Sequence, residues 1–209
     1  MERHPISEAD VSPNARTVES YEDIADDYAR ETFGARVLSG GLRRLAEVVP
    51  AGQVLEIGSG PGWDADALEE AGLQVHRTDI TQAFIDFQQA RGKRVDRLDA
   101  INDDLDGPYD AVVTLHVLQH VEPSDLPAVL AKVAGALRPG GRFLVSIPLG
   151  EGAGWEVGES GAPYYRALRS EADFIAALGK AGLEPEWTQR SVEDEESGWL
   201  CVLASRPEA

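Results

Sequence analysis

Apolar residues in this chain of 209 residues follow two patterns that alternate along the sequence. Short apolar runs without an amphipathic period, such as 54–57 and 109–115, predict buried strands. Between them, apolar residues recur at helical spacing, and Gly, Pro or polar residues separate the segments. The patterns predict helices over 18–32, 35–49, 63–71, 81–90, 123–137 and 170–181, and strands over 54–57, 73–78, 93–98, 109–115, 142–147, 183–191 and 199–205.

This alternation predicts an α/β fold with right-handed crossovers and a parallel sheet covered on both faces. The two last strands follow one another directly, so we expect an antiparallel hairpin that closes one edge. The stretch 148–162 interrupts the alternation with five glycines and Trp155, and its length predicts a lid or binding loop. We expect residues 1–15, which contain Pro5 and Pro13, to be loosely attached.

Three glycines follow the first predicted strand at alternate positions, Gly58, Gly60 and Gly62, and Glu56 precedes them. Glycines at such positions let the backbone turn sharply and approach a ligand without a Cβ in the way. Pro61 suits the first turn of a helix. A strand, a tight loop and a helix start are the setting in which α/β proteins hold nucleotide-like cofactors.

The spacing of these residues separates the classes of nucleotide site. A dinucleotide fingerprint needs a third glycine where Trp63 stands, and a P-loop needs a Gly-Lys-Ser/Thr end that is missing here. The pattern E-x-G-x-G-x-G instead resembles the first motif of the class I S-adenosylmethionine (SAM) dependent methyltransferases. SAM carries no phosphate, so neither a lysine nor a pyrophosphate-facing helix end is required.

The resemblance extends from about residue 35 to the C-terminus, and the Leu-Arg-Pro-Gly-Gly run at 137–141 resembles the family's turn before the fifth strand. It implies a Rossmann-like, doubly wound seven-stranded sheet with the last strand antiparallel, in an α/β/α sandwich with an N-terminal helical cap. We therefore expect a tail and cap helix at 1–34 and a SAM-binding domain at 35–209, with 148–169 as lid or substrate loop.

The resemblance also implies a cofactor site. Asp79, at the end of the second strand, matches the family's acidic residue on the ribose hydroxyls, and Asp99 matches the position beside the adenine. The helix with Tyr21 and Tyr28 resembles the one that closes over the cofactor in many small-molecule methyltransferases. The residues expected to bind SAM are Tyr21, Tyr28, Glu56, Gly58, Ser59, Gly60, Gly62, Asp79, Ile80, Asp99, Ala100 and Leu115.

Several of these residues have a second interpretation. A carboxylate such as Glu56 in an apolar strand is costly unless bonded, which favours a role in orienting the loop and the cofactor's amino group. Asp103, Asp104 or Asp106 could serve in place of Asp99. The two tyrosines could be ordinary core aromatics on an amphipathic helix, or rings that hold a sulfonium by cation–π attraction.

The segment after the fourth strand, 115–121, resembles the one that lines the methyl-transfer site in this family. His116 is the catalytic candidate, because an imidazole takes up a proton near neutral pH. His120 is four residues away, but no third ligand is evident, so we expect no metal. The candidate substrate contacts are His120, Trp155, Tyr164, Tyr165 and Arg166.

The net charge of the chain limits the kinds of partner that it can bind. Lys and Arg total 19 against 37 for Asp and Glu, a net charge of −18, which argues against nucleic acid and against anionic membranes. We interpret the acidity as a solvated, self-repelling surface, and the alternatives are a cationic partner or a salty habitat. The single cysteine, Cys201, suits a small core residue, and the N-terminal 20 residues lack a signal peptide's apolar core, so we expect a cytoplasmic protein. The oligomeric state stays open.

These observations favour methyl transfer from SAM to O, N or C of a small molecule or peptide, in a role that fits specialised metabolism. The Asn/Asp-Pro-Pro-Tyr/Phe tetrapeptide that marks base-nitrogen methylation in the family is missing, and Leu115-His116-Val117-Leu118 stands there. Two alternatives remain. One is a SAM-binding sensor or partner subunit without methyl transfer, and the other is a non-methylating enzyme of the same fold, such as a cyclase.

Overall fold

A seven-stranded mixed sheet forms the centre of the computed structural model, which describes residues 12–33, 40–158, 161–192 and 198–208. The strand order is β3-β2-β1-β4-β5-β9-β8. The strands are β1 (Gln53–Ile57), β2 (Gln74–Asp79), β3 (Val95–Arg97), β4 (Tyr109–Thr114), β5 (Leu137–Pro148), β8 (Glu184–Val192) and β9 (Gly198–Ser205). The first five run parallel, and β9 is antiparallel to both of its neighbours, as predicted.

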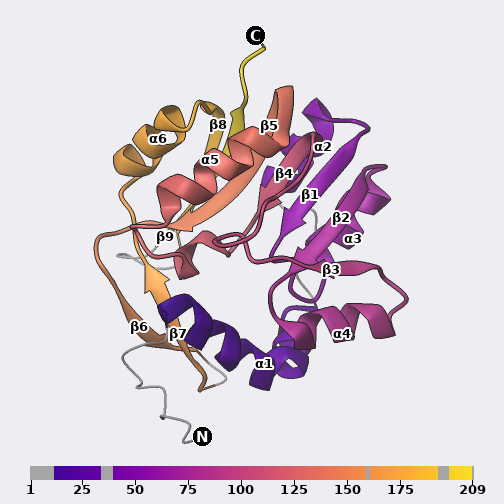
Figure 1. Cartoon of the computed structure of the whole chain (residues 1–209), viewed down its shortest axis with the longest axis vertical. Coiled ribbons are helices and arrows are strands. Elements are labelled where there is room, and N and C mark those ends of the chain that lie inside the picture. Colours follow the sequence, from indigo (N-terminus) through magenta and orange to yellow (C-terminus); the bar gives the residue numbers. More distant parts are fainter. Residues whose placement is uncertain (1–11, 34–39, 159–160, 193–197, 209) are drawn as a thin grey trace, which may run out of the picture.

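Helices cover the sheet on both faces (Figure 1). They are α2 (Gly40–Val48), α3 (Trp63–Glu70), α4 (Gln82–Ala90), α5 (Leu126–Ala136) and α6 (Glu171–Lys180). Leu130 of α5 and Phe174 of α6 belong to one apolar cluster, and Leu45 of α2 and Leu68 of α3 belong to a second. A sheet with an apolar cluster on each face explains why its strands read as nearly continuous apolar runs.

The final hairpin closes the sheet edge in an order that the sequence did not predict. Strand β9, the last in the chain, inserts between β5 and β8, so the earlier strand β8 becomes the edge. Strand β9 is the more buried of the two, and Val202, Leu203 and Ala204 on it are buried. With the apolar strand β9 inside the sheet and the more polar strand β8 at its edge, the most apolar surface is removed from water.

The glycine-rich stretch after β5 is not the loop that we expected. It forms β6 (Ala153–Val157) and β7 (Pro163–Ala167), which pair as a separate two-stranded antiparallel sheet. The error has a physical cause, because the glycines that suggested a loop lie mainly before and after the strands. Gly150 and Gly152, for example, take positive φ values of 142° and 91° at the entrance.

Helix α1 (Pro13–Glu31) begins earlier than predicted. The Ser12 hydroxyl accepts a hydrogen bond from the Ala15 amide at 3.2 Å, and Pro13 occupies the first turn, where it costs no hydrogen bond. Proline was read as a sign of loose structure, but here it starts the helix. The expected start of α2 at residue 35 lies outside the described residues.

Two further boundaries differ from the prediction. Strand β5 begins at Leu137, which pairs with Tyr109, and the pairing then shifts so that Ala111 faces Arg142. The expected turn at Arg-Pro-Gly-Gly therefore lies inside β5, where the strand pairing is irregular. Helix α3 begins after Gly62, so Pro61 precedes the helix instead of lying in its first turn. None of the described helices is both long and apolar enough to cross a membrane.

Candidate active site

The glycine loop joins β1 to α3 at the carboxyl edge of the parallel strands, next to β4, where the strand order reverses. Gly58, Gly60 and Gly62 all have positive φ values, of 69°, 51° and 86°. A Cβ on Gly58 would lie 2.5 Å from Val117 Cγ2, whereas one on Gly60 would meet no atom within 4 Å. The loop therefore needs glycine, for its backbone shape at all three positions and for space at Gly58.

A buried arginine, Arg77, holds this loop in place through hydrogen bonds. Arg77 on β2 donates to the Gly62 carbonyl at 3.3 Å and to Gln88 Oε1 at 3.0 Å. Gln88 in turn donates to Ser59 Oγ at 2.7 Å and to the Gly60 carbonyl at 2.8 Å. Asp66 and Glu69 on α3 balance the charge of Arg77, at 2.7 and 2.8 Å. The loop is thus held in shape by side chains from three different elements.

Asp79 at the end of β2 is buried beside the loop. Its Oδ2 accepts from the Gly60 amide at 2.7 Å, and its Oδ1 accepts from the Thr81 amide at 2.8 Å. Burial raises the pKa of Asp79, and these backbone hydrogen bonds oppose the rise. The Thr81 side chain, at the N-terminus of α4, makes no capping hydrogen bond to the helix. Because a carboxylate has about four acceptor positions, Asp79 keeps capacity for a ligand.

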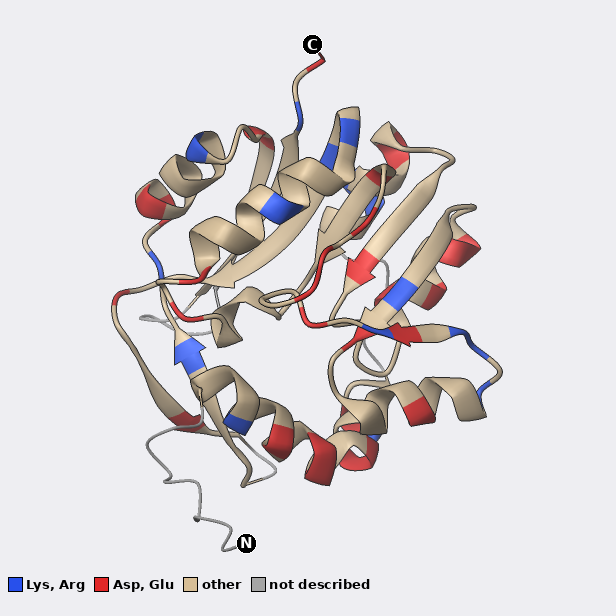
Figure 2. Cartoon of the chain, in the orientation of Figure 1, with Lys and Arg blue, Asp and Glu red and all other residues tan. Residues whose placement is uncertain are grey.

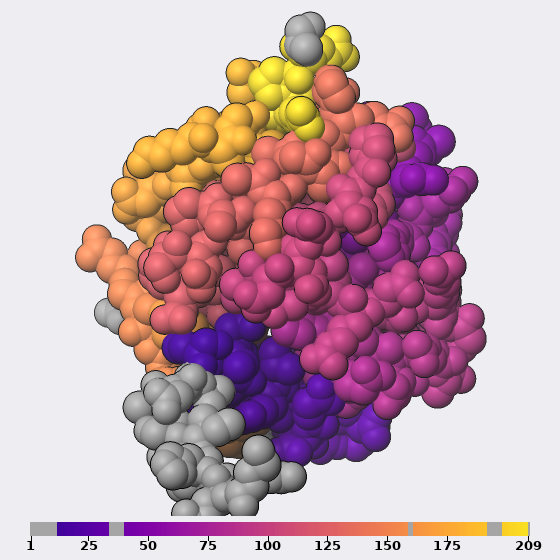
Figure 3. Space-filling view, viewed as in Figure 1, coloured from indigo at the N-terminus to yellow at the C-terminus, as the bar shows by residue number. Residues whose placement is uncertain are grey.

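A cavity of about 470 Å³ opens between the glycine loop and helix α1. Tyr21 and Tyr28 of α1 pack against Phe84 of α4, with ring centroids 5.8 and 5.7 Å apart, as the roof of this cavity. Figure 3 shows α1, in indigo, closing against the magenta segment that contains α4. The expected cofactor residues that line the cavity are Tyr21, Tyr28, Gly58, Ser59, Gly60, Asp79, Ile80 and Leu115.

Carboxylates dominate the charge around this cavity. Burial raises the pKa of Asp64, which lines the cavity, to about 6. Burial, together with nearby Asp64 and Asp79, also raises the pKa of Glu56 well above its usual value, although Arg77 opposes this. Glu56 Oε2 accepts no hydrogen bond from any residue in the described part of the chain. Such a buried carboxylate is stabilised when a cationic donor arrives.

The two histidines after β4 both border the cavity but differ in environment. His116 is exposed, has a positive φ of 58°, and donates its backbone N–H to Ser146 Oγ at 2.8 Å. Its ring centroid is 4.2 Å from that of Trp199. His120 is buried on the 3-10 turn η3 (Leu118–His120), and burial lowers its pKa to about 4. They do not share one helix, so the helical i, i+4 arrangement of the two rings does not form.

A second cavity, of about 330 Å³, lies between α1 and the β6–β7 hairpin. Tyr21, Tyr28 and Thr32 border both cavities, so the roof helix also separates them. Tyr164 of β7 lines the second cavity, and its hydroxyl donates to Glu156 Oε2 at 3.0 Å. A cofactor-sized cavity beside a smaller one is the arrangement needed for a reaction between two bound molecules.

Several predicted site residues lie elsewhere. Asp99 caps its own turn, since it accepts from the Ile101 amide at 2.9 Å, and neither it nor Ala100 borders a described cavity. Gly62 and Glu56 border neither cavity, and the Gly62 carbonyl accepts from Arg77 instead. Trp155, Tyr165 and Arg166 also lie outside both cavities. Their contacts with cofactor or substrate stay predictions.

Those three hairpin residues have structural contacts instead. Trp155 lies over Tyr165 with centroids 6.1 Å apart, and the Arg16 guanidinium is 5.0 Å from its ring. Arg166 pairs with Glu156 at 3.1 Å. Trp155 and Tyr165 lie on the face of the hairpin opposite to Tyr164 and pack towards α1. Arg166 shares the face of Tyr164, and both side chains bond to Glu156 there.

Comparisons with known proteins agree with this geometry. A family model described as a methyltransferase domain matches residues 55–143. A probable S-adenosylmethionine-dependent methyltransferase of Mycolicibacterium smegmatis is 34% identical over 57% of this chain and 47% of its own length. A ubiquinone biosynthesis O-methyltransferase of Xanthomonas campestris is 27% identical over 57% of this chain and 53% of its own. The chain spans about half the length of these curated relatives.

Solved structures show the same fold over nearly the whole chain. The 1,6-didemethyltoxoflavin-N1-methyltransferase of Burkholderia thailandensis has a TM-score of 0.72 at 20% identity, covering 99% of this chain and 94% of that one. The [4+2]-cyclase SpnF has the same TM-score, 0.72, at 16% identity and 98% coverage of both chains. Over residues 55–143 the chain is therefore similar to a methyltransferase domain, and its fold is that of class I S-adenosylmethionine-dependent methyltransferases. Some of the solved neighbours hold S-adenosylhomocysteine or SAM.

The residues present fit SAM, the cofactor that the sequence motifs predict. SAM carries a sulfonium and an ammonium, and the cavity offers the carboxylates Asp64 and Asp79 with the unsatisfied Glu56 behind them. The open space over Gly60 leaves the loop backbone accessible to a ligand. Tyr21, Tyr28 and Phe84 supply rings that can face a cation.

Sequence reasoning overlooked part of this candidate site. The lining residues that it did not propose for the site are Asn14, Thr17, Val18, Thr32, Pro61, Trp63, Asp64, Thr81, Phe84 and Val117. Asp64 and Phe84 carried a usable signal, because one stands in the first turn after the glycine loop and the other on the inner face of α4. Arg77 and Gln88 carried none, since a polar residue in a strand or helix reads as exposed.

Proposed function

We propose that this chain transfers the methyl group of SAM to an oxygen, nitrogen or carbon atom of a small molecule or peptide. The observation that supports the proposal is the pair of adjacent cavities, of about 470 and 330 Å³, which share Tyr21, Tyr28 and Thr32 as a common wall. The larger cavity contains the glycine loop and Asp79, and the smaller one leaves room for an acceptor.

The bound cofactor would supply an activated methyl group on a sulfonium, so the protein mainly has to align the acceptor and exclude water. Tyr21 and Tyr28 lie where the acceptor and the cofactor meet. His116 and His120 border the larger cavity near the end of β4. Of the two, His116 is the better candidate for a proton acceptor, because it is exposed to solvent while His120 is buried.

Titration calorimetry with SAM and with its demethylated product tests the cofactor site. We expect both to bind at sub-millimolar concentration, and failure of both would refute the proposal. Methyl-labelled SAM then separates the alternatives when it is incubated with a metabolite extract and the chain. A labelled product that gains one methyl group supports transfer, while binding without any labelled product supports a sensor or a partner subunit.

The fold likeness to the [4+2]-cyclase SpnF keeps a cyclase as the second candidate. Both reactions would use the same cavities, so structure-guided variants that block SAM binding affect both. Only the fate of the methyl group separates them. A product that forms without any transfer of label would support the cyclase and would contradict methyl transfer.

A further inference from the structure

His120 is held in one protonation form by its surroundings. Its Nδ1 lies 2.7 Å from the backbone carbonyl oxygen of Tyr165 on β7. A carbonyl oxygen can only accept, so Nδ1 must carry the proton. Burial keeps the ring neutral at ordinary pH, with Arg166 and His116 nearby acting in the same direction. The other nitrogen, Nε2, therefore presents a lone pair and can only accept.

That lone pair orients the hydroxyl of Tyr21. His120 Nε2 lies 3.3 Å from the Tyr21 oxygen and 3.3 Å from Gln119 Nε2. Because Nε2 can only accept, the Tyr21 O–H donates to it. The phenol oxygen then has only lone pairs left for a ligand. Burial also raises the pKa of Tyr21, so its hydroxyl stays protonated.

Tyr21 borders both cavities, so this acceptor-only oxygen lies at the boundary between the cofactor cavity and the smaller one. The only charged side chains that border either cavity, within the part of the chain described, are Asp64 and Asp79 in the larger and Glu31 in the smaller. Figure 2 shows that acidic residues also follow one another along α1. The nearby Arg166 borders neither cavity and is paired with Glu156 at 3.1 Å. An anion placed here would face like charges and no cationic side chain in the lining.

We propose that the methyl acceptor is a molecule without negative charge that donates a hydrogen bond from a hydroxyl or N–H group to the Tyr21 oxygen, with His120 as the positioning residue. This inference rests on the proposed function, because it assigns the class of the acceptor for that reaction. It distinguishes His120, which acts through Tyr21, from His116, and it excludes carboxylate and phosphate acceptors.

The first test measures the histidine directly and needs neither cofactor nor acceptor. The chain is labelled with ¹⁵N at its histidine side chains, and the ring nitrogens are assigned with a His120→Gln variant. We expect His120 to show a protonated Nδ1 and an unprotonated Nε2 from pH 5.5 to 8. A protonated Nε2 at pH 7 would overturn the proposal, whatever the outcome of SAM binding.

The second test uses three matched probes on the chain saturated with S-adenosylhomocysteine: phenol, anisole and benzoate. Phenol donates a hydrogen bond, anisole has the ring without the donor, and benzoate carries a negative charge. Ligand-observed NMR compares their affinities. We expect phenol to bind about fivefold more tightly than anisole, the value of one net hydrogen bond, and benzoate to bind most weakly.

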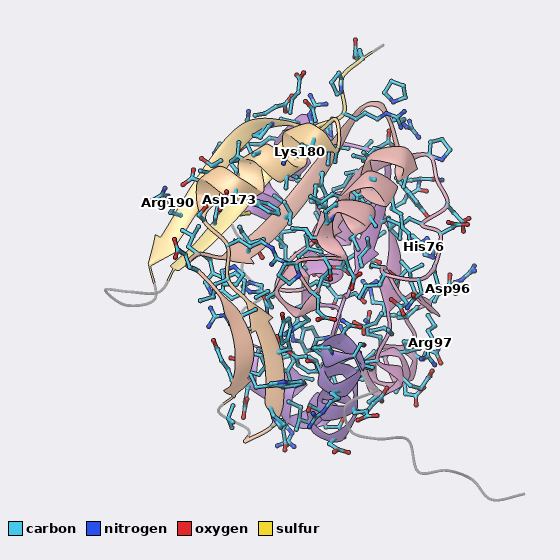
Figure 4. All side chains as sticks on the ribbon, turned by 60° about the vertical axis from the view of Figure 1, so that its left-hand side comes forward. His76, Asp96, Arg97, Asp173, Lys180 and Arg190 are labelled. Carbon is cyan, nitrogen blue, oxygen red and sulfur yellow. The ribbon has the colours of Figure 1, made fainter. Side chains whose placement is uncertain are left out.

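Tyr21→Phe keeps the ring and removes the hydroxyl, and it should abolish the preference for phenol over anisole. Tyr109→Phe is the matched control, because Tyr109 also makes a hydrogen bond to a histidine, with its oxygen 2.9 Å from His76 Nδ1. His76 and its partner Asp96 lie at the edge of the molecule (Figure 4). This variant should keep the preference of the wild type.

Each possible result of these tests either supports the proposal or overturns it. Equal affinity for phenol and anisole, benzoate binding as tight as phenol, or no phenol binding at all would each overturn the proposal. So would a preference for phenol that survives Tyr21→Phe. If S-adenosylhomocysteine itself fails to bind, the proposed function falls, and the histidine measurement still reports separately on the geometry of His120.

Discussion

Replacement of Arg77 by methionine is the sharpest test of how the glycine loop is held. The guanidinium is 1% exposed and donates to Gly62, Gln88, Asp66 and Glu69. Methionine has a similar length and packs well in irregular apolar spaces, so the substitution removes charge and hydrogen bonds with little loss of volume. It leaves the Gly62 carbonyl and Gln88 Oε1 without this donor.

The size of the effect follows from the partners. Removal of one member of a buried ion pair costs about 3–5 kcal/mol, because the other charge stays buried and uncompensated. Asp66 also contacts Arg91 and Lys93, which remain after the substitution. We therefore expect the lower end, about 3 kcal/mol. For a chain of this size that corresponds to a melting temperature lower by roughly 6–12 °C.

Urea denaturation and thermal melting measure the loss of stability, and titration calorimetry measures SAM affinity in the folded variant. Arg94→Met is the control, because the Arg94 side chain is 90% exposed and lies 3.5 Å from Asp96. It should change stability by no more than about 0.5 kcal/mol. A loss below about 1 kcal/mol for Arg77→Met, or unchanged SAM affinity, would refute the idea that this network holds the loop.

Three further predictions concern the cavity. Gly60→Ala should lower the stability by only about 1–2 kcal/mol, because of the positive φ of 51°, yet it should weaken SAM binding in calorimetry. Gly62→Ala should lower the melting temperature further, because its Cβ would lie 2.3 Å from Gln88 Oε1. Asp64, with its pKa raised to about 6, should release protons when the cationic cofactor binds near pH 6, so the binding enthalpy should depend on the buffer in the wild type and not in Asp64→Asn. For His120, whose folded pKa of about 4 lies below the unfolded value near 6.5, the unfolded state takes up more protons between these values. Stability measured by urea denaturation should therefore fall as pH falls from 6.5 to 4, and His120→Gln should reduce this fall.

Much of the fold was predictable from the sequence because local patterns and tertiary packing agree. Strand β4 was expected over 109–115 and runs from Tyr109 to Thr114, and helix α6 was expected over 170–181 and runs from Glu171 to Lys180. In β4 the continuous apolar run matches a strand that is buried along almost its whole length, and in α6 the helical spacing of Phe174 and Leu178 matches the buried face. Such agreement between local and global preferences leaves little room for error.

The hairpin shows where local pattern fails. Its strands are short and mostly exposed, so β6 carries almost no buried apolar residue to reveal its period. Long-range bonds hold it instead. The Tyr165 amide donates to Thr17 Oγ1 of α1 at 2.9 Å, and the Tyr165 carbonyl accepts from His120. These contacts join residues far apart in the sequence, so no local window contains the information.

The same limit applies to the site. The glycine pattern and Asp79 were visible because backbone geometry and strand ends leave a local signature. The proton on His120 is decided by a carbonyl 45 residues later, and the support of the loop is decided by Arg77 and Gln88, whose burial is a tertiary property. Motifs located the cofactor loop, while the chemistry of the acceptor side depends on contacts between distant segments.

Helix α1 connects these two halves of the site. Glu22 accepts from the amides of Gln82 and Ala83 at the start of α4, at 2.6 and 2.8 Å, where a carboxylate also suits the helix dipole. Thr32 accepts from Trp63 Nε1 at 3.2 Å, and Thr17 bonds to the hairpin. Hydrogen bonds therefore connect the middle of α1 to α4, its C-terminal end to Trp63 of α3, and its N-terminal part to the hairpin. Because Tyr21 and Tyr28 on this one helix border both cavities, any displacement of α1 changes the cofactor site and the acceptor site together, and their affinities should be coupled.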